Sequence, residues 1–251
     1  MRKWKEIYPA VEKAVVPGLR HSQYAYKDKL KAYAKPDFWW LDAGCGRGIF
    51  PEWMRRHDRD VLPPRVRLVG IDMDMPSLHD NTTVVHRVAG NMEQAPFRAG
   101  SFHLITSNAV MEHVADPAAA LRNVHALLKA NGLFIFHTPN FYNYQTLLAS
   151  LLPQRAKNAL SWHLEGRREE DVFPTHYRMN TAAKIRRLAK ECGFQVRDLE
   201  LVNSSPETLR LGPLVIFELI GIRILNWRIF KLYRSNIIAV LEKLPDAAAG
   251  E

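Results

Sequence analysis

The stretch "LDAGCGRG", residues 41–48, decides the fold of this chain. It follows the apolar run "FWW" at 38–40 and precedes "IFPEWMRRH" at 49–57, so it joins a strand-like segment to a helix-like one. Three glycines at alternate positions, led by Asp42, predict a loop whose backbone approaches a ligand closely. A phosphate, a nucleotide or an amino acid could occupy such a loop, and the rest of the chain has to distinguish them.

Strand-like and helix-like segments alternate along the chain after this loop. Short apolar or alternating runs predict six strands, at 38–41, 65–72, 82–90, 101–110, 133–138 and 194–202. Their alternation with helices predicts an α/β fold, a Rossmann-like and mostly parallel sheet with helices on both faces. In such sheets ligands bind outside the carboxyl ends of the strands, which is where the glycine loop lies.

The helices between these strands have recognisable ends. One is expected at 49–57, and another begins at Pro117 after the cap Asp116 and ends at Gly132. A third, within 180–193, is closed by Gly193. Two amphipathic helices are expected within 4–34. We therefore predict an N-terminal helical cap at 1–34, a sheet domain at 35–203 and a C-terminal helical extension at 204–251.

The spacing of the glycines argues against two of the loop's alternative ligands. A dinucleotide fingerprint is G-x-G-x-x-G, whereas Gly44, Gly46 and Gly48 give G-x-G-x-G. A phosphate-binding loop needs Lys and then Ser or Thr after its last glycine, but Ile49 and Phe50 follow here. The remaining interpretation is a loop whose backbone approaches a ligand closely, with Asp42 placed to accept from a ligand ammonium group.

Two further segments are suited to a nucleoside. Asp72 ends the second predicted strand, where a carboxylate can accept from both ribose hydroxyls. Asn91 and Met92, after the third, offer a polar edge and an apolar face to an adenine. Turn chemistry alone is the alternative explanation for Asp42 and Asp72.

Taken together, these segments resemble the class I S-adenosylmethionine-dependent methyltransferases. "LDAGCGRG" is similar to their first motif, "VGIDMD" to the acidic end of the second strand, and "AGNMEQAPFRAGSFHLITSNAVMEHVADP" to the middle motifs. "ANGLFIFHTPN" resembles the branch that contains the ubiquinone O-methyltransferases. The resemblance covers about 35–202 and implies S-adenosyl-L-methionine as the cofactor. It also implies that a helix such as the one holding Tyr24 and Tyr26 caps this cofactor, core packing being the alternative.

The resemblance assigns individual residues to the cofactor. Asp42, Gly44 and Gly46 would meet its methionyl part, Asp72 the ribose, Asn91 with Met92 the adenine, and Ser107 with Asn108 the sulfonium. The full set of expected cofactor contacts is Asp42, Gly44, Cys45, Gly46, Gly48, Asp72, Met73, Asn91, Met92, Ser107 and Asn108. Cys45 is expected to be a small spacer and not a nucleophile. Because Asn108 departs from the "E-x-x-E-H" pattern of the ubiquinone enzymes, no metal is expected.

Three histidines are candidates for a catalytic base, because imidazole titrates in the useful pH range. They are His113 in "MEHV", His137 after the fifth strand and His176 in "FPTHYR". A hydrogen-bonded structural role is the alternative for each, and Glu112 is expected to orient or cap. The segment 139–179 and the C-terminal helices are expected to cover the acceptor, and Arg167, Arg168, Tyr177 and Arg178 favour an anionic or sugar-bearing one.

The composition limits the classes of partner that this chain is expected to bind. With 47% hydrophobic and 24% charged residues the chain has globular values, which excludes wholesale disorder. The net charge of +9 is spread along the chain without a nucleic-acid motif, so we expect no nucleic-acid partner. The acceptor is expected to be a small molecule, lipid- or sugar-linked, because the apolar run beyond Leu211 would suit a lipid portion. The chain has only two cysteines, and this low number favours a cytoplasmic location.

The C-terminal third holds the most apolar stretch of the sequence. Basic and aromatic residues alternate at 227–234, which is typical of a helix at a membrane interface, so peripheral membrane contact through 211–234 is expected. A helix packed on the sheet, a homodimer interface or a lid are the alternatives. The sequence thus predicts a methyltransferase that favours O-methylation, and a non-catalytic binding module of the same fold is the competing hypothesis.

Overall fold

The computed structural model describes residues 2–143, 174–204, 206 and 212–245. The chain divides into two compact units. The helical unit comprises Met1–Ala25, Pro139–Pro174 and Leu201–Ile237, and the sheet unit comprises Tyr26–Thr138, Thr175–Glu200 and Ile238–Glu251. Both are discontinuous in sequence, and the division of the chain at 34/35 and 203/204 stays a prediction.

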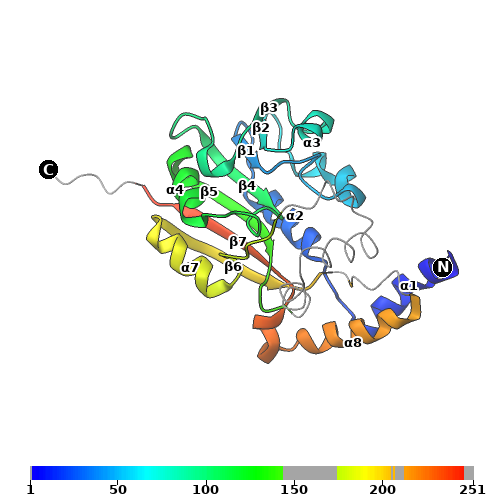
Figure 1. Cartoon of the computed structure of the whole chain (residues 1–251). Coiled ribbons are helices and arrows are strands. Elements are labelled where there is room, and N and C mark those ends of the chain that lie inside the picture. The colour runs from blue at the N-terminus through cyan, green and yellow to red at the C-terminus, as the bar shows by residue number, and fades with distance from the viewer. Residues whose placement is uncertain (1, 144–173, 205, 207–211, 246–251) are drawn as a thin grey trace. The chain divides into compact units, whose positions relative to one another are not determined.

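A seven-stranded sheet forms the centre of the fold (Figure 1). Its strands are β1 (Trp39–Ala43), β2 (Arg67–Asp72), β3 (His86–Ala89), β4 (Phe102–Asn108), β5 (Leu128–Pro139), β6 (Phe194–Val202) and β7 (Asn236–Lys243). They lie in the order β3-β2-β1-β4-β5-β7-β6. The pairs β1–β2, β1–β4, β2–β3 and β4–β5 are parallel. The order reverses at β1, so the α/β sheet predicted from the sequence is confirmed.

The core of the sheet unit consists of the apolar residues of its central strands. Trp40, Leu104, Phe134 and Phe136 are fully buried, because central parallel strands are covered on both faces. Burying one such side chain stabilises the fold by roughly 1.5–3 kcal/mol. The continuous apolar runs of the sequence therefore act as the framework that holds the strand ends in place.

The helices at 117–127 and 182–191 confirm the capping signals. Helix α4 (Pro117–Leu127) begins after Asp116, whose side chain accepts from the backbone N–H of Ala118 and Ala119, each at 3.0 Å. Helix α7 (Ala182–Glu191) begins after Thr181, and Gly193 beyond its end has a φ of +82°. The short helix α3 (Met75–Asp80) follows β2.

Two predicted helix bounds are wrong. No α-helix covers 49–57. Instead 3-10 helices form at η1 (Glu52–His57) and η2 (Arg59–Val61), and the N–H groups of Ile49 and Phe50 before them donate to the Asp58 carboxylate. The helix after Asp116 ends at Leu127 and not at Gly132, which lies inside β5. There the β4–β5 register shifts, next to Asn131 at a φ of +61°.

The C-terminal segment contains a strand that the sequence analysis placed in a helical extension. Residues Asn236–Lys243 form β7, which lies between β5 and β6. Six consecutive residues of this strand are buried. A short apolar run does not by itself distinguish a buried strand from a buried helix, which is why the prediction was wrong here.

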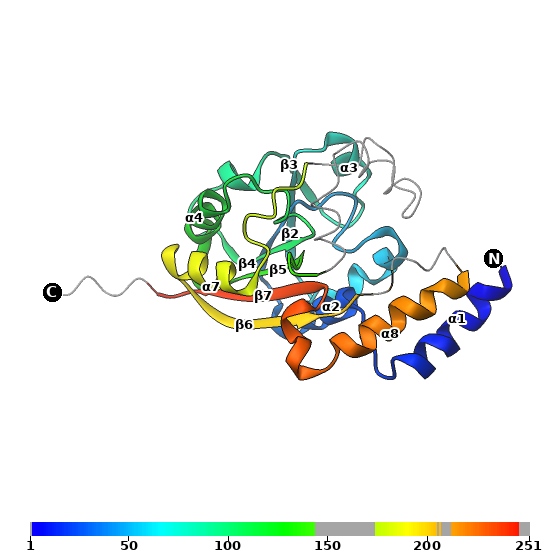
Figure 2. The ribbon, with the colours of Figure 1, turned by 60° about the horizontal axis from the view of Figure 1, so that its bottom comes forward.

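In the helical unit, α1 (Arg2–Val15) packs along α8 (Val215–Leu225), as Figure 2 shows. Val16, Leu219 and Ile222 form their common core, and Arg223 donates to the carbonyl of Val15 at 3.0 Å. The second expected N-terminal helix is α2 (Ser22–Tyr33). A 3-10 helix, η6 (Arg228–Tyr233), follows α8. Over the described residues no helix has the length and apolarity needed to cross a bilayer.

Candidate functional site

The glycine loop and Asp72 meet at the carboxyl ends of β1 and β2. The backbone N–H groups of Gly44 and Cys45 donate to the carbonyl of Ile71, at 2.8 and 3.2 Å. The N–H of Gly46 donates to Oδ2 of Asp72 at 2.7 Å, and Asp74 N–H donates to Oδ1 at 2.8 Å. The two segments that the sequence assigned to one ligand are therefore joined directly.

The glycines at 44 and 46 are required for different reasons. Both have a positive φ, +73° at Gly44 and +42° at Gly46, which is unfavourable for other residues. A Cβ at Gly44 would lie 2.3 Å from Cγ2 of Val110, so the position is blocked by packing. A Cβ at Gly46 would meet no atom within 4 Å. Open space thus lies beside Gly46, where the methionyl part of a ligand was expected.

Two buried side chains that the sequence analysis missed hold the loop in shape. Asn81 donates from Nδ2 to the carbonyls of Cys45 (3.1 Å) and Gly46 (3.0 Å) and is fully buried. Asp58 accepts from Ile49, Phe50 and Thr83, and burial raises its pKa. Both lie outside the motifs, and no local pattern marked them. Both are polar side chains buried among apolar residues, and only the folded structure reveals that burial.

Asp42 lies at the end of β1 in a chain of buried hydrogen bonds. Its Oδ1 accepts from the Thr106 hydroxyl at 2.8 Å, and Oγ1 of Thr106 accepts from Nε1 of Trp40 at 2.7 Å. Burial raises the pKa of Asp42 to about 7, although the Thr106 hydrogen bond opposes the shift. Burial also raises the pKa of Tyr26, and the charge of Asp42 raises it further. A cation brought to Asp42 would favour its ionised form.

The remaining predicted cofactor contacts lie at the ends of β2, β3 and β4. Met73 is largely exposed, whereas Met92 is buried. The Asn91 side chain accepts from Glu93 N–H at 2.9 Å and caps the 3-10 helix η3 (Met92–Gln94). Ser107 is buried, and its hydroxyl has no hydrogen-bond partner among the described residues. A buried hydroxyl without a partner is costly and indicates a place for a polar ligand group.

Cys45 has the environment of a spacer. It is buried as a free thiol, and burial raises its pKa well above the usual range. A Cβ added at Gly70 of β2 would lie only 2.6 Å from the sulfur of Cys45. The packing of Cys45 against this glycine is consistent with the expectation that it is not a nucleophile.

His137 is held in one tautomer by Asn108. Asn108 donates from Nδ2 to the carbonyl of Ile49 at 2.9 Å, so its Oδ1 faces Nδ1 of His137 at 2.8 Å and accepts from it. Nε2 is then an acceptor, and it has no hydrogen-bond partner among the described residues. Burial lowers the pKa of His137 to about 4, so the ring is neutral at pH 7. The ring of Tyr26 lies 5.8 Å away, between centroids.

His113 and His176 are brought toward each other by Glu112. The carbonyl of Glu112 accepts from the N–H of His176 (2.7 Å) and of Tyr177 (3.1 Å). Arg178 continues this contact by donating to the carbonyl of Ala115 at 2.7 Å. The segment around His176 therefore runs beside "MEHV". Arg167 and Arg168, also expected in the acceptor cover, lie outside the described residues.

The Glu112 side chain has a structural partner of its own. Its Oε2 accepts from the Thr138 hydroxyl at 2.9 Å, and Nδ2 of Asn180 donates to the same hydroxyl at 2.7 Å. All three residues are buried. This polar cluster ties the end of β5 to the residue that precedes α7 and its cap, so Glu112 orients the segment around His176.

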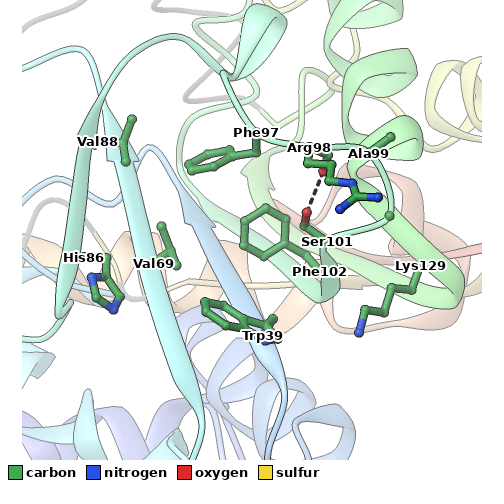
Figure 3. A pocket seen from close by; sticks show the side chains of 11 residues that line it. Trp39, Val69, His86, Val88, Phe97, Arg98, Ala99, Ser101, Phe102 and Lys129 are labelled. Carbon is green, nitrogen blue, oxygen red and sulfur yellow. Dashed lines mark hydrogen bonds between the residues drawn. The ribbon is translucent and has the colours of Figure 1, made fainter.

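A cavity of about 630 Å³ lies at the amino ends of β1, β3 and β4, and Figure 3 shows the side chains that line it. Trp39, His86 and Phe102, which line it, are the first residues of their strands. Lys129 also lines it and lies 3.1 Å from Nε2 of His103. None of the predicted site residues lines this cavity, so it is separate from the glycine loop. Within the described ranges no cluster of three His, Cys, Asp or Glu side chains could hold a metal ion.

Comparison with known proteins decides the family. A family model described as a methyltransferase domain matches residues 19–199, most of the chain. The chain belongs to this methyltransferase family. The ubiquinone biosynthesis O-methyltransferase of Acinetobacter baylyi is 35% identical over 109 residues, which are 40% of this chain and 43% of that protein. The matched part of this methyltransferase-domain protein thus corresponds to less than half of its curated relative.

Solved structures share the fold of this methyltransferase-domain protein. An S-adenosylmethionine-dependent methyltransferase from Mesorhizobium loti has a TM-score of 0.57 at 17% identity, covering 88% of this chain and 96% of that one. Geranyl diphosphate C-methyltransferase from Streptomyces coelicolor, solved with S-adenosyl-L-homocysteine, has a TM-score of 0.53 at 18% identity, covering 89% and 76%. At these identities the likeness concerns the fold.

Proposed function

We propose that this protein transfers a methyl group from S-adenosyl-L-methionine to a small-molecule acceptor. The observation that supports this most is the open space at Gly46, whose N–H is bonded to Asp72 at the carboxyl ends of β1 and β2. Asp42, Gly44, Cys45, Gly46 and Gly48 would surround the methionyl part. Asp72 and Met73 would meet the ribose, Asn91 and Met92 the adenine, and Ser107 and Asn108 the region of the sulfur.

The bound cofactor would supply an electrophilic methyl group with a good leaving group, so the chain has to align the acceptor, exclude water and remove a proton where needed. His137, His113 and His176 are the candidates to receive that proton. His137 is favoured by its geometry, because Asn108 fixes its tautomer and leaves Nε2 as an acceptor. His113 and His176 then contribute to acceptor binding.

The acceptor is proposed to be lipid- or sugar-linked and to be methylated on oxygen. The ubiquinone biosynthesis O-methyltransferases among the relatives support this choice. Arg178 and His176 would suit an anionic or sugar-bearing group. We also propose a cytoplasmic location with a peripheral position at the inner membrane face, and no nucleic-acid partner. A homodimer is a further proposal, which a mass measurement in solution tests.

Calorimetric titration with S-adenosylhomocysteine tests the cofactor site. Gly46→Val should abolish binding, because its side chain would fill the space beside the loop. Gly100→Val is the matched control. Gly100 also has a positive φ (+64°), and a Cβ added there would meet open space, but it lines the cavity described above and not the glycine loop. The control should bind normally. Normal binding by Gly46→Val, in a variant folded by circular dichroism, would contradict the proposal.

A further inference from the structure

Helix α8, the 3-10 helix η6 and the residues beside them expose a concentration of large apolar side chains. Fifteen large hydrophobic residues are exposed in the described part of the chain. Eight of them lie between residues 214 and 233, a stretch of 20 residues in the helical unit. Phe217 and Ile229 are 74% and 75% exposed. We call these eight residues the outer face, and they are Leu214, Phe217, Ile220, Ile224, Trp227, Ile229, Leu232 and Tyr233.

Packing against α1 does not account for this outer face. Helix α8 uses Leu219 and Ile222 for that contact, and both are buried, as is Val215 on the same helix. Phe217, Ile220 and Ile224 recur at intervals of three and four residues, so they form a second apolar stripe on the helix. A helix that only covers a neighbour has one such stripe, whereas a helix apolar all round is covered on both sides.

The charges around the outer face indicate which kind of partner it binds. Between residues 212 and 234 there are four basic side chains and one acidic side chain, Glu218. Arg223 and Arg234 donate to backbone carbonyls, while Arg228 and Lys231 are exposed residues of η6. Trp227 and Tyr233 have the amphipathic rings that favour a membrane–water interface. A second copy of the chain would bring like charges together, whereas an anionic lipid surface complements them.

We propose that the outer face of α8 and η6 docks on an anionic lipid bilayer and lies in its interface. Phe217, Ile220, Ile224 and Ile229 enter the boundary of the acyl chains, and Arg228 and Lys231 contact lipid phosphates. The docking itself is independent of methyl transfer. Its use, to bring the protein to a lipid-linked acceptor, rests on the proposed function.

Co-sedimentation of the full chain with vesicles tests this surface. Vesicles of phosphatidylcholine with about 30% phosphatidylglycerol should bind the protein at least tenfold more tightly than vesicles of pure phosphatidylcholine. Added salt should weaken this binding. The double variant Phe217→Ser/Ile229→Ser should lose at least tenfold in affinity. The control Met75→Ser/Val85→Ser, which alters two exposed apolar residues of the sheet unit, should bind as the unchanged protein does.

Several outcomes would overturn the docking proposal. These are no preference for anionic vesicles, equal loss in the control, or a dimer in light scattering that Phe217→Ser/Ile229→Ser dissociates, which would make the outer face an interface between copies. Titration of each variant with S-adenosylhomocysteine keeps the two proposals apart. Vesicle binding without cofactor binding would contradict the methyltransferase function and leave the docking surface standing.

Discussion

At the scale of single residues, Asp42 links the site to pH. Because burial raises its pKa to about 7, the folded protein holds a proton that the unfolded chain releases between about pH 4 and pH 7. The stability of the ligand-free protein should therefore fall as the pH rises through this window, by on the order of a few kcal/mol. Asp42→Asn should remove this part of the pH dependence. Urea unfolding at pH 5 and pH 7.5 measures it, and an unchanged slope in the variant would contradict the assignment.

The same carboxyl group should couple cofactor binding to proton release. A ligand ammonium favours the ionised form of Asp42, so affinity for S-adenosylhomocysteine should rise as the pH approaches 7 and then level off. Calorimetry at pH 6 in buffers with different ionisation enthalpies should detect the released proton. Asp42→Asn should show neither the rise nor the release.

Asp72 is expected to act on both the ligand and the loop. Asp72→Ala should weaken cofactor binding by about 1–3 kcal/mol, because it removes an acceptor for ligand hydroxyls and the bond from Gly46 N–H. Glu191→Ala is a suitable control, since Glu191 is an exposed carboxylate at the end of α7. Unchanged calorimetric affinity in Asp72→Ala would exclude it from the ribose site.

At the scale of elements, the cap of α4 is a separate test of the fold. Asp116→Ala should lower the free energy of unfolding by about 1 kcal/mol, because two backbone N–H groups at the start of the helix lose their acceptor. Asp116→Asn retains an acceptor and should recover most of the loss. Urea denaturation measures both, and equal stability of the Ala variant and the parent would show that the cap contributes nothing.

The segment from His176 to Arg178 is expected to serve the acceptor and not the cofactor. His176→Ala and Arg178→Ala should reduce turnover with the acceptor found by screening, while cofactor affinity stays unchanged. Arg187→Ala, on the exposed side of α7, is the control for the loss of a positive charge. If both variants turn over like the parent, this segment only supports the fold and the acceptor binds elsewhere.

At the scale of the whole molecule, β7 decides how much of the chain the fold needs. A protein truncated after Val202 would lack the strand that lies between β5 and β6, although the sequence analysis treated 204–251 as an extension. We expect the truncated protein to lose cooperative unfolding and cofactor binding together, because β6 loses its neighbour in the sheet. Thermal unfolding followed by circular dichroism measures this. A truncated protein that unfolds cooperatively and binds the cofactor would contradict the expectation.

The sequence alone determined those features that have a local cause. The caps of α4 and α7, the glycine loop after β1 and the acidic end of β2 each depend on residues close together in the chain. Apolar runs bounded by turns likewise located six of the seven strands, because a buried strand must be apolar over its own length. The family resemblance followed from the same short motifs.

Only the tertiary structure decided the features that depend on distant partners. Asp58 and Asn81 hold the glycine loop from 8 to 36 residues away, and Asn108 fixes the tautomer of His137 from a neighbouring strand. The run at 236–243 became a strand because a place between β5 and β6 pairs its backbone, which no local pattern reveals. Burial likewise sets the pKa of Asp42 and His137, since desolvation arises from the surrounding fold and not from sequence neighbours.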